Sequence, residues 1–343
     1  MTENTTNDLL GTELVDISER TGKERPWRRH KMDARSVAKS MYRIAAAHPR
    51  RDAAFKKKAD RIWNCSNYLV FAQNVNTETG ETSRKLVAAN FCRDRLCPMC
   101  AWRKSLVTFH QVSEIMDYID RERPGLVPLF LTLTMRNVQL DQLGDGIERI
   151  LKAWRLMMNK GNNRKPHHVT VGWMRTLEIT YNKATGEWHP HIHAIILVEP
   201  DYFTNPEKYI DHDEWVSEWR RALKADYDPS VDVRTIKRAR AHAVAEVSKY
   251  TVKPGDWIDG DEDATDERVR LLSLTLARRR LVAFGGLMKD VRKLLAQEDA
   301  ETADLVVIDG EDELRGDVTV ALLRYDWQIG LTNYVCTEVT QTP

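Results

Sequence analysis

The sequence predicts an α+β fold in which helices flank a central antiparallel sheet of about five strands. Predicted strands and helices are mixed along the chain and do not follow the regular alternation of a doubly wound parallel sheet. Two β-type runs, GWMRTLEITYN and EWHPHIHAIILV, also lie on either side of a short turn at residues 182–186. Such an arrangement is typical of a β-hairpin, so an antiparallel hairpin is expected at the centre of the sheet.

The elements before this hairpin follow from periodicity and turn residues. Residues 1–60 are polar, charged and weakly periodic, with one helix expected near residues 34–47. The segment NYLVFAQNVNTETGETSRKLVAANF predicts two strands around a turn at residues 78–80. A helix is expected after Cys100 and ends at residues 124–125, Pro-Gly. A short strand in PLFLTLTMRNV and a helix in DGIERILKAWRLMMNK then lead to the hairpin.

Three further elements are expected after the hairpin. DEWVSEWRRALKADY has the spacing of an amphipathic helix, and VDVRTIK that of a strand. AVAEVSKYTVK predicts a helix that Pro254 and Gly255 end. The mixture again favours an antiparallel sheet.

Bulk composition bounds the class of protein. The chain has 343 residues and 42% hydrophobic content, enough for one large domain or two smaller ones. No apolar run approaches the ~20 residues that cross a bilayer. The polar and acidic N-terminus, MTENTTNDLLGTELVDISER, lacks the pattern of a signal peptide. We therefore expect a cytoplasmic protein that does not associate with membranes.

The net charge of +1 conceals a segregation of charge. Fifteen Lys or Arg stand against four acids between Arg20 and Arg61. Residues 256–267 hold seven acids and no base, and residues 298–317 hold nine acids and one arginine. The asymmetry predicts a basic surface for a polyanion, together with acidic segments that are solvated or regulatory.

A cluster of cysteines predicts a structural metal. CRDRLCPMC holds Cys92, Cys97 and Cys100, and Cys65 stands where the first strand of the preceding hairpin begins. That hairpin returns Cys65 to the side of Cys92, which completes four thiolates for a tetrahedral Zn²⁺. A redox Cys-x-x-Cys is the alternative, but it lacks the βαβ context. The sequence thus predicts a small zinc-binding module before the central sheet, with no open position for catalysis.

The stretch WHPHIHAIILV places three histidines at strict alternation, so His189, His191 and His193 share one face of a strand. One interpretation is a solvated strand end that is rich in histidine. The other is a metal site, because imidazoles are common ligands and a strand fixes their spacing.

The other half of the hairpin bears on this choice. Its turn brings Glu178 roughly opposite Pro190 and His191. An acid at this interior position is unfavourable unless it is paired or bound to a cation. Two imidazoles and one carboxylate, from His191, His193 and Glu178, suit Mg²⁺ or Mn²⁺ with positions left for water or a phosphate oxygen.

The segment AEVSKYTVK adds candidate catalytic groups. In the predicted helix Glu246 and Tyr250 are at i and i+4 and share a face, with Lys249 and Lys253 close by. An ordinary half-buried tyrosine beside an ion pair is the alternative interpretation. Nearby basic residues suited to DNA phosphates are Arg234, Lys237, Arg238 and Arg240.

These motifs, taken in order, resemble a known family. CRDRLCPMCAWRK, FLTLTMRN, HPHIHAIILV, EVSKYTVK and RRRLVAFGGLMKD follow one another as in the rolling-circle plasmid replication initiators, or Rep proteins. These belong to the HUH endonuclease superfamily, named for two histidines separated by a bulky hydrophobic residue, here His191, Ile192 and His193. The resemblance runs from about residue 61 to about residue 334.

The resemblance implies a reaction. Tyr250 matches the family's nucleophile, which attacks a DNA phosphodiester, retains the 5′-phosphate covalently and frees a 3′-OH for synthesis. A free tyrosine is ionised in only about one molecule in a thousand at pH 7, a deficit of about 4 kcal/mol. A divalent ion on the phosphate, with Lys253 near the helix face, lowers the remaining barrier. The resemblance also implies that Glu246 directs hydrolysis at termination, as a base for water.

The expected organisation follows from motifs and resemblance together. A flexible basic leader occupies residues 1–60, and the zinc-binding module with its helix residues 61–125. The HUH nuclease core spans residues 126–255. A helical and acidic C-terminal region, residues 256–343, completes the domain.

The expected function is origin-specific nicking and joining of DNA that begins and ends rolling-circle plasmid replication. The expected partners are the double-strand origin with an unpaired hairpin loop, a host helicase and polymerase, and a second copy in a homodimer. A single-tyrosine transposase or relaxase is the alternative within enzymes. A zinc-dependent DNA-binding regulator without catalysis is the alternative of another class.

Overall fold

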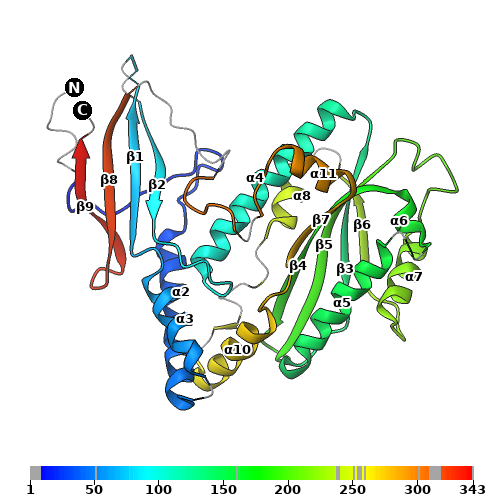
Figure 1. Ribbon diagram of the computed structural model, residues 1–343, viewed down its shortest axis with the longest axis horizontal. Coiled ribbons are helices and arrows are strands. Elements are labelled where there is room, and N and C mark those ends of the chain that lie inside the picture. The colour runs from blue at the N-terminus through cyan, green and yellow to red at the C-terminus, as the bar shows by residue number, and fades with distance from the viewer. Residues whose placement is uncertain are drawn as a thin grey trace. The chain divides into compact units, whose positions relative to one another are not determined.

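A computed structural model divides the chain into two compact units. The structure describes residues 9–50, 52–76, 78–79, 81–159, 161, 163–236, 240–249, 252, 257–258, 260–299, 302–308 and 318–341. Residues 1–107 and 303–343 form unit 1, and residues 108–302 form unit 2. These boundaries differ from the four expected segments, since unit 1 combines both ends of the sequence (Figure 1).

Unit 1 is built on a four-stranded antiparallel sheet in the order β2-β1-β8-β9. The expected hairpin around residues 78–79 is confirmed as β1 (Tyr68–Val75) and β2 (Thr82–Ala89). Its other strands are β8 (Val318–Gln328) and β9 (Asn333–Gln341). These last two occupy a region for which helix was expected, and the acidic residues 309–317 lie outside the described residues. β8 forms because its alternate residues Ala321, Leu323 and Tyr325 are buried against β1.

The expected flexible leader is largely helical. α2 (Trp27–Ala47) and α3 (Ala53–Asn64) follow one another, and α2 contains the helix expected from residue 34. A buried stripe on α2 comprises Ala34, Val37, Ala38, Met41 and Ile44. Basic side chains such as Arg28 and Lys39 lie on the exposed face of the same helix, which makes the segment amphipathic.

Unit 2 contains the predicted central sheet. Five strands lie in the order β6-β3-β5-β4-β7, and every neighbouring pair is antiparallel. In chain order they are β3 (Val127–Thr134), β4 (Thr170–Asn182), β5 (Glu187–Val198), β6 (Val231–Thr235) and β7 (Val282–Gly285). The α+β prediction is confirmed, and β4 and β5 form the expected central hairpin.

Helices cover both faces of this sheet (Figure 1). On one face, Trp173 of β4 packs against Trp154 of α5 (Leu143–Met157), and α7 (His212–Leu223) packs beside α5. On the other face, Met174 and Ile195 pack with α4 (Pro98–Glu122), α8 (Arg240–Val247) and α11 (Gly286–Leu294). Trp173 and Met174 are consecutive, so strand alternation sends them to opposite faces.

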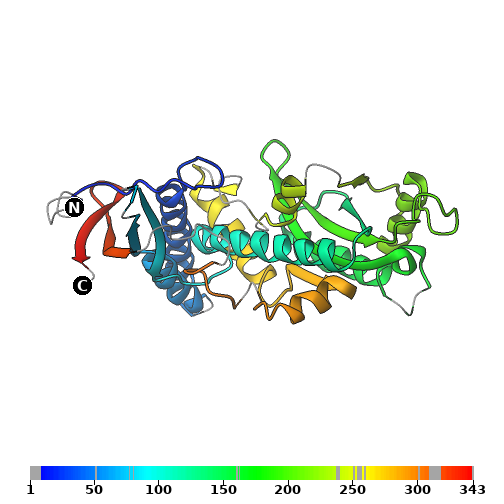
Figure 2. The ribbon, with the colours of Figure 1, turned by 90° about the horizontal axis from the view of Figure 1, so that it is seen from above.

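The remaining helical elements are α6 (Lys165–Val169), the 3₁₀ turn η1 (Leu140–Gln142) and α10 (Glu262–Thr275). Figure 2 shows α4 as one uninterrupted helix, as expected between Cys100 and Pro124. Among the described residues, none of the helices has the length and apolarity needed to span a membrane.

The helix predicted through AVAEVSKYTVK is shorter than expected. α8 ends at Val247, well before Pro254. Val252 instead forms a parallel bridge with Ile179 of β4, so the backbone is extended at that point. Pairing with the sheet outweighs helix propensity here, because Val252 becomes buried by it.

The segment AFGGLMKD joins β7 to α11 through two glycines that allow a close approach to β4. A Cβ added at Gly285 would lie 2.2 Å from the ring of Trp173, and one added at Gly286 would lie 2.3 Å from the carbonyl oxygen of Val171. Gly286 also has φ +53. Only glycine satisfies both conditions, which accounts for the glycine pair in this motif.

Candidate metal centres and DNA-processing site

The β4–β5 hairpin brings Glu178, His191 and His193 to one face of the sheet. Glu178 pairs directly with His191, and Thr176 pairs with His193. Directly paired residues project from the same face, so the register puts the carboxylate beside both imidazoles. The turn, and with it the register, was visible in the sequence.

The three side chains converge on one carboxylate oxygen. Oε2 of Glu178 lies 3.2 Å from Nε2 of His191 and 3.0 Å from Nε2 of His193. All three residues are buried, and their candidate ligand atoms lie within 4.8 Å of one another. A buried carboxylate with two imidazoles is a compact site with one face turned away from the sheet.

The hydrogen bonds of His191 support a cation at this site. Its Nδ1 lies 3.2 Å from the backbone oxygen of His189, and a carbonyl oxygen only accepts. Nδ1 therefore carries the proton of the neutral ring, and Nε2 presents a lone pair to the lone pairs of Glu178. Two lone pairs at this distance repel unless a proton or a metal ion is shared. The residues thus fit Mg²⁺ or Mn²⁺.

Neighbouring groups orient the imidazoles. Oγ1 of Thr132 lies 3.2 Å from Nδ1 of His193, and the ring of Phe130 lies 5.6 Å from the same imidazole. His189 does not join the cluster, since its Nδ1 lies 2.7 Å from Oδ1 of Asn137. Burial, and after it the neighbouring His191, lowers the pKa of His189. Thr132 had no signal of its own in the sequence.

Glu246 reaches the same site from α8. Its Oε1 lies 3.8 Å from Nε2 of His193 and 2.5 Å from Nζ of Lys249. The helix therefore supplies a second carboxylate beside the histidine pair. Tyr250 and Lys253, the expected nucleophile and its electrostatic support, lie outside the described residues.

The expected DNA-binding residues lie on β6 and at the start of α8. Arg234 projects from the edge strand β6, is exposed and donates from Nε to Asp232 at 3.0 Å. Arg240 opens α8, but its side chain is not among those described. Lys237 and Arg238 lie outside the described residues.

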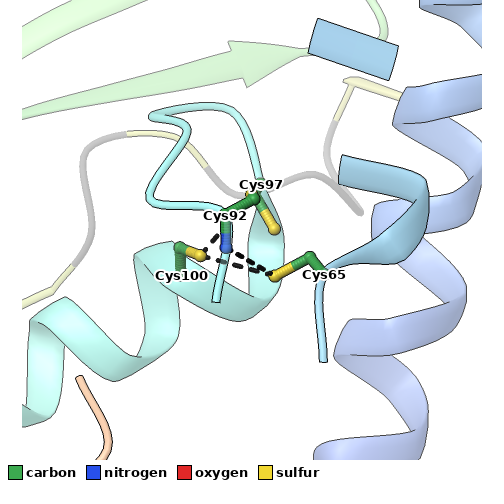
Figure 3. Close-up of side chains that lie close together, drawn as sticks. All are labelled: Cys65, Cys92, Cys97 and Cys100. Atoms are coloured by element: carbon green, nitrogen blue, oxygen red, sulfur yellow. Dashed lines mark hydrogen bonds between the residues drawn. The ribbon is translucent and has the colours of Figure 1, made fainter. Parts of the chain in front are cut away.

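Unit 1 brings the four predicted cysteines together (Figure 3). Cys65 follows α3, and Cys97 and Cys100 stand at the start of α4. Sγ of Cys100 lies 3.5 Å from Sγ of Cys65 and 3.7 Å from Sγ of Cys92. Cys65, Cys97 and Cys100 are buried, whereas Cys92 is half-buried.

The sulfur separations fit a tetrahedral ion. Four sulfurs at ~2.3 Å from a central Zn²⁺ lie about 3.8 Å apart, close to the two separations above. Backbone amides add support, since N–H of Arg93 donates to Sγ of Cys100 at 3.1 Å and N–H of Cys92 donates to Sγ of Cys65 at 3.3 Å. Burial raises the pKa of the Cys97 thiol, which a bound cation reverses.

Two supporting residues escaped the sequence analysis. Lys31 of α2 is fully buried and donates from Nζ to the backbone oxygen of Cys65 at 2.5 Å and to Oδ1 of Asn67 at 2.7 Å. Tyr334 of β9 donates to the backbone oxygen of Ser66 at 2.8 Å. Both hold the turn that carries the first thiolate. One lysine among many and one distant tyrosine give no local signal for such roles.

Comparison with known proteins supplies the family. The family model described as "Replication protein" matches residues 83–335. A "Protein rep" from Bacillus amyloliquefaciens is 36% identical over 345 residues, which cover 94% of this chain and 97% of that protein. Another from Lentilactobacillus hilgardii is 33% identical, with 94% and 98% covered. One from Streptococcus pneumoniae is 32% identical, with 94% of each covered. No solved structure matches the chain.

The family match spans both candidate metal centres except for Cys65. It includes the cysteine run, the β4–β5 hairpin and α8, which carried the resemblance noted in the sequence. That resemblance is confirmed. The chain therefore belongs to the family of replication proteins, and it is a plasmid replication initiator.

Proposed function

We propose that this initiator nicks and rejoins one strand of the plasmid origin by a tyrosine nucleophile, beginning and ending rolling-circle replication. The observation that carries the proposal is the convergence of His191 and His193 on Glu178, with Glu246 3.8 Å from His193. Two acids and two imidazoles on one sheet face suit a reaction at a phosphate, where negative charge must be stabilised and protons moved.

The residues divide the work of cleavage. His191, His193 and Glu178 would hold Mg²⁺ or Mn²⁺, which supplies Lewis acidity at a phosphate oxygen when bound. The phenolic oxygen of Tyr250 forms a bond to phosphorus, and the bond from phosphorus to the 3′-oxygen breaks. The phenol's proton leaves to solvent or a nearby base, and the departing 3′-oxygen is protonated. Lys253 stabilises the charge on the phosphate.

Glu246 takes the closing step. A carboxylate is ionised at neutral pH and accepts a proton from water. Its place beside His193 lets it direct that water at a second phosphate, so that the round ends by hydrolysis. Its Oε1 also forms an ion pair with Nζ of Lys249 at 2.5 Å.

The cysteine module and the partners complete the proposal. Zn²⁺ held by Cys65, Cys92, Cys97 and Cys100 stabilises unit 1 and takes no part in the reaction. The substrate is the double-strand origin of the plasmid, with an unpaired hairpin loop at the nick. Arg234, Lys237, Arg238 and Arg240 contact its phosphates. A host helicase and polymerase act on the nicked product, and two copies of the chain pair at the origin.

The test compares two variants on a supercoiled plasmid carrying the cognate origin. Tyr250→Phe keeps the ring but removes the nucleophilic oxygen, so nicking and the covalent protein–DNA adduct should both disappear. Glu246→Ala should still nick and form the adduct, but over-long and multimeric products should accumulate. Gel mobility of the plasmid and label transfer from DNA to protein measure the two effects.

Matched controls separate chemistry from folding. Tyr209→Phe and Glu207→Ala change exposed residues of the same types outside the site and should behave as the parent protein. Cleavage by Tyr250→Phe at the parental rate contradicts the nucleophile. If Glu246→Ala fails in the first nick as completely as Tyr250→Phe, the glutamate is a metal ligand or a positioning residue and the proposed division of labour is wrong.

A further inference from the structure

A cavity of about 630 Å³ lies beside the histidine pair in unit 2. Its walls come from β3, from the edge strand β6 and from α8. The lining residues are Phe130, Thr132, His193, Asp232, Arg234, Thr235, Ile236, His242, Ala243 and Glu246. The volume is that of an ordinary small-molecule site and far exceeds what a metal ion needs. Because His193 and Glu246 belong to both, the cavity is continuous with the candidate nicking site.

The charges of the described lining favour a base over the sugar–phosphate backbone as its occupant. Among the described side chains, the acids Asp232 and Glu246 face one permanent cation, Arg234. The guanidinium of Arg234 already donates to Asp232. The carboxylate of Glu246 forms a separate ion pair with Lys249. A phosphate needs an excess of positive charge, as on DNA-backbone tracks. The described part of this lining has no such excess.

The apolar part of the lining suits a flat ring. Phe130 is half-buried on β3, with Ile236 and Ala243 on neighbouring walls. Unpaired bases stack on aromatic and aliphatic side chains, whereas bases in a duplex are already stacked on each other. Sheet pairing fixes Phe130 opposite Arg234 and Thr132 opposite Asp232, so the ring and the two polar residues share one face.

We propose that this cavity binds one unpaired base next to the scissile phosphate and selects a base with an exocyclic amino group. This base site rests on the proposed nicking function, because only that function makes the neighbouring phosphate the one that is cleaved. Asp232 is the specificity-determining residue, because a carboxylate accepts hydrogen bonds and donates none. Cytosine offers its N4 amino group to such an acceptor, whereas uracil and thymine place a carbonyl oxygen there.

The exposure of Asp232 supports its role. Its side chain is 40% exposed, so it remains open to a ligand while Arg234 holds it by one donor. A carboxylate has about four acceptor sites. With uracil in place of cytosine, the carbonyl oxygen at position 4 of the base faces a carboxylate oxygen of Asp232, and neither can donate a hydrogen bond. The site therefore disfavours uracil as well as favouring cytosine.

The test measures binding of fluorescent ten-nucleotide single strands, dC10 and dU10, by anisotropy in buffer without added Mg²⁺ or Mn²⁺, in which the strands are not cleaved. The two probes have the same size and backbone and differ in the group at position 4 of the base. Parent protein should bind dC10 at least about fivefold more tightly than dU10, which corresponds to about 1 kcal/mol, the low end of the range for a bidentate base contact. Asp232→Asn supplies a donor as well as an acceptor, so its preference should fall below about twofold.

A matched variant tests whether the loss of a negative charge anywhere on the surface has the same effect as its loss at Asp232. Asp228→Asn removes the same charge from an exposed aspartate that is paired with Arg220 and does not line the cavity. It should keep the parental preference. Equal binding of dC10 and dU10 by the parent, an unchanged preference in Asp232→Asn, or an equal loss in Asp228→Asn each overturns the proposal.

A second measurement does not depend on a variant. A dC10 strand carrying 5-iodocytosine is irradiated with the parent protein, and the crosslinked peptides are identified by mass spectrometry. Attachment to the peptide carrying Phe130 or to that carrying His242 supports the cavity, and attachment only to peptides outside its lining contradicts it. Neither assay requires strand cleavage. A protein that prefers dC10 but never nicks refutes the proposed function alone, and one that nicks without the preference refutes the base site alone.

Discussion

The two clusters of potential metal ligands in this chain are built in opposite ways. Four cysteines in unit 1 surround a closed centre, and their sulfurs also accept backbone N–H groups. Three residues in unit 2, Glu178, His191 and His193, converge from one hairpin and leave the far side open to a cavity. A full ligand shell favours stability, whereas an incomplete one leaves positions for substrate.

The supports of the two clusters differ as well. Elements distant in sequence hold the cysteine cluster, including Lys31 of α2 and Tyr334 of β9. Adjacent strands of one sheet hold the histidine cluster, through the pairing of β4, β5 and β3. Loss of the cysteine cluster should therefore unfold unit 1. Loss of the histidine cluster should abolish its activity while unit 2 stays folded.

The largest expected effect is in the cysteine cluster. Cys97→Ser removes a fully buried thiolate, and metal binding at such sites contributes about 10 kcal/mol or more to folding. The variant should lose zinc and leave unit 1 unfolded, as measured by metal analysis and circular dichroism. Cys336→Ser, at a buried cysteine outside the cluster, is the control. A folded Cys97→Ser protein that retains one zinc shows that the cluster is not the closed centre described.

The second effect concerns activity without unfolding. His193→Ala should abolish detectable nicking while thermal stability stays close to that of the parent, because the sheet retains all its backbone pairing. His168→Ala, at an exposed histidine, should nick normally. The measurement is plasmid nicking with Mn²⁺ or Mg²⁺, and again with a chelator. Undiminished nicking by His193→Ala in the presence of a chelator would show that the histidine cluster is not a metal site needed for cleavage.

The third effect is a pH dependence in unit 1. Burial, and after it the charge of Arg29, lowers the pKa of His30 to about 4, and its ring stacks on Trp102. Because the unfolded chain binds this proton more readily, the free energy of unfolding should fall as the pH drops from 6.5 to about 4, by up to ~3 kcal/mol. His30→Phe should flatten this part of the profile in urea unfolding. Identical profiles for the two proteins contradict it.

The smallest effect tests the distant support of the cysteine cluster. Tyr334→Phe removes one buried hydrogen bond to Ser66, worth about 1–3 kcal/mol when its acceptor stays unsatisfied. Zinc should remain bound, and the urea midpoint of unit 1 should decrease. Tyr118→Phe, at a half-buried tyrosine of α4 in unit 2, is the control. An unchanged midpoint means that β9 holds the cysteine turn by packing alone.

The sequence predicted features whose causes are local. The register of Glu178 opposite His191 follows from a short turn and strict alternation, and the spacing of Cys97 and Cys100 follows from one helical turn. β8 was missed because its stability comes from pairing with β1, about 250 residues earlier in the sequence, and β9 pairs in turn with β8. The start of α2 before residue 34 and the whole of α3 were missed because basic residues dominate both segments.

The joining of both ends of the chain in unit 1 has a consequence for synthesis. β8 pairs with β1, and residues near the N-terminus bond to β9, with N–H of Gly11 donating to the oxygen of Cys336 at 2.9 Å. A nascent chain therefore cannot close this sheet until its last strands have left the ribosome. A frameshift after residue 302 spares every strand of the five-stranded sheet but deprives the four-stranded sheet of unit 1 of β8 and β9. Such a truncated chain should expose the edge of β1 that β8 otherwise covers.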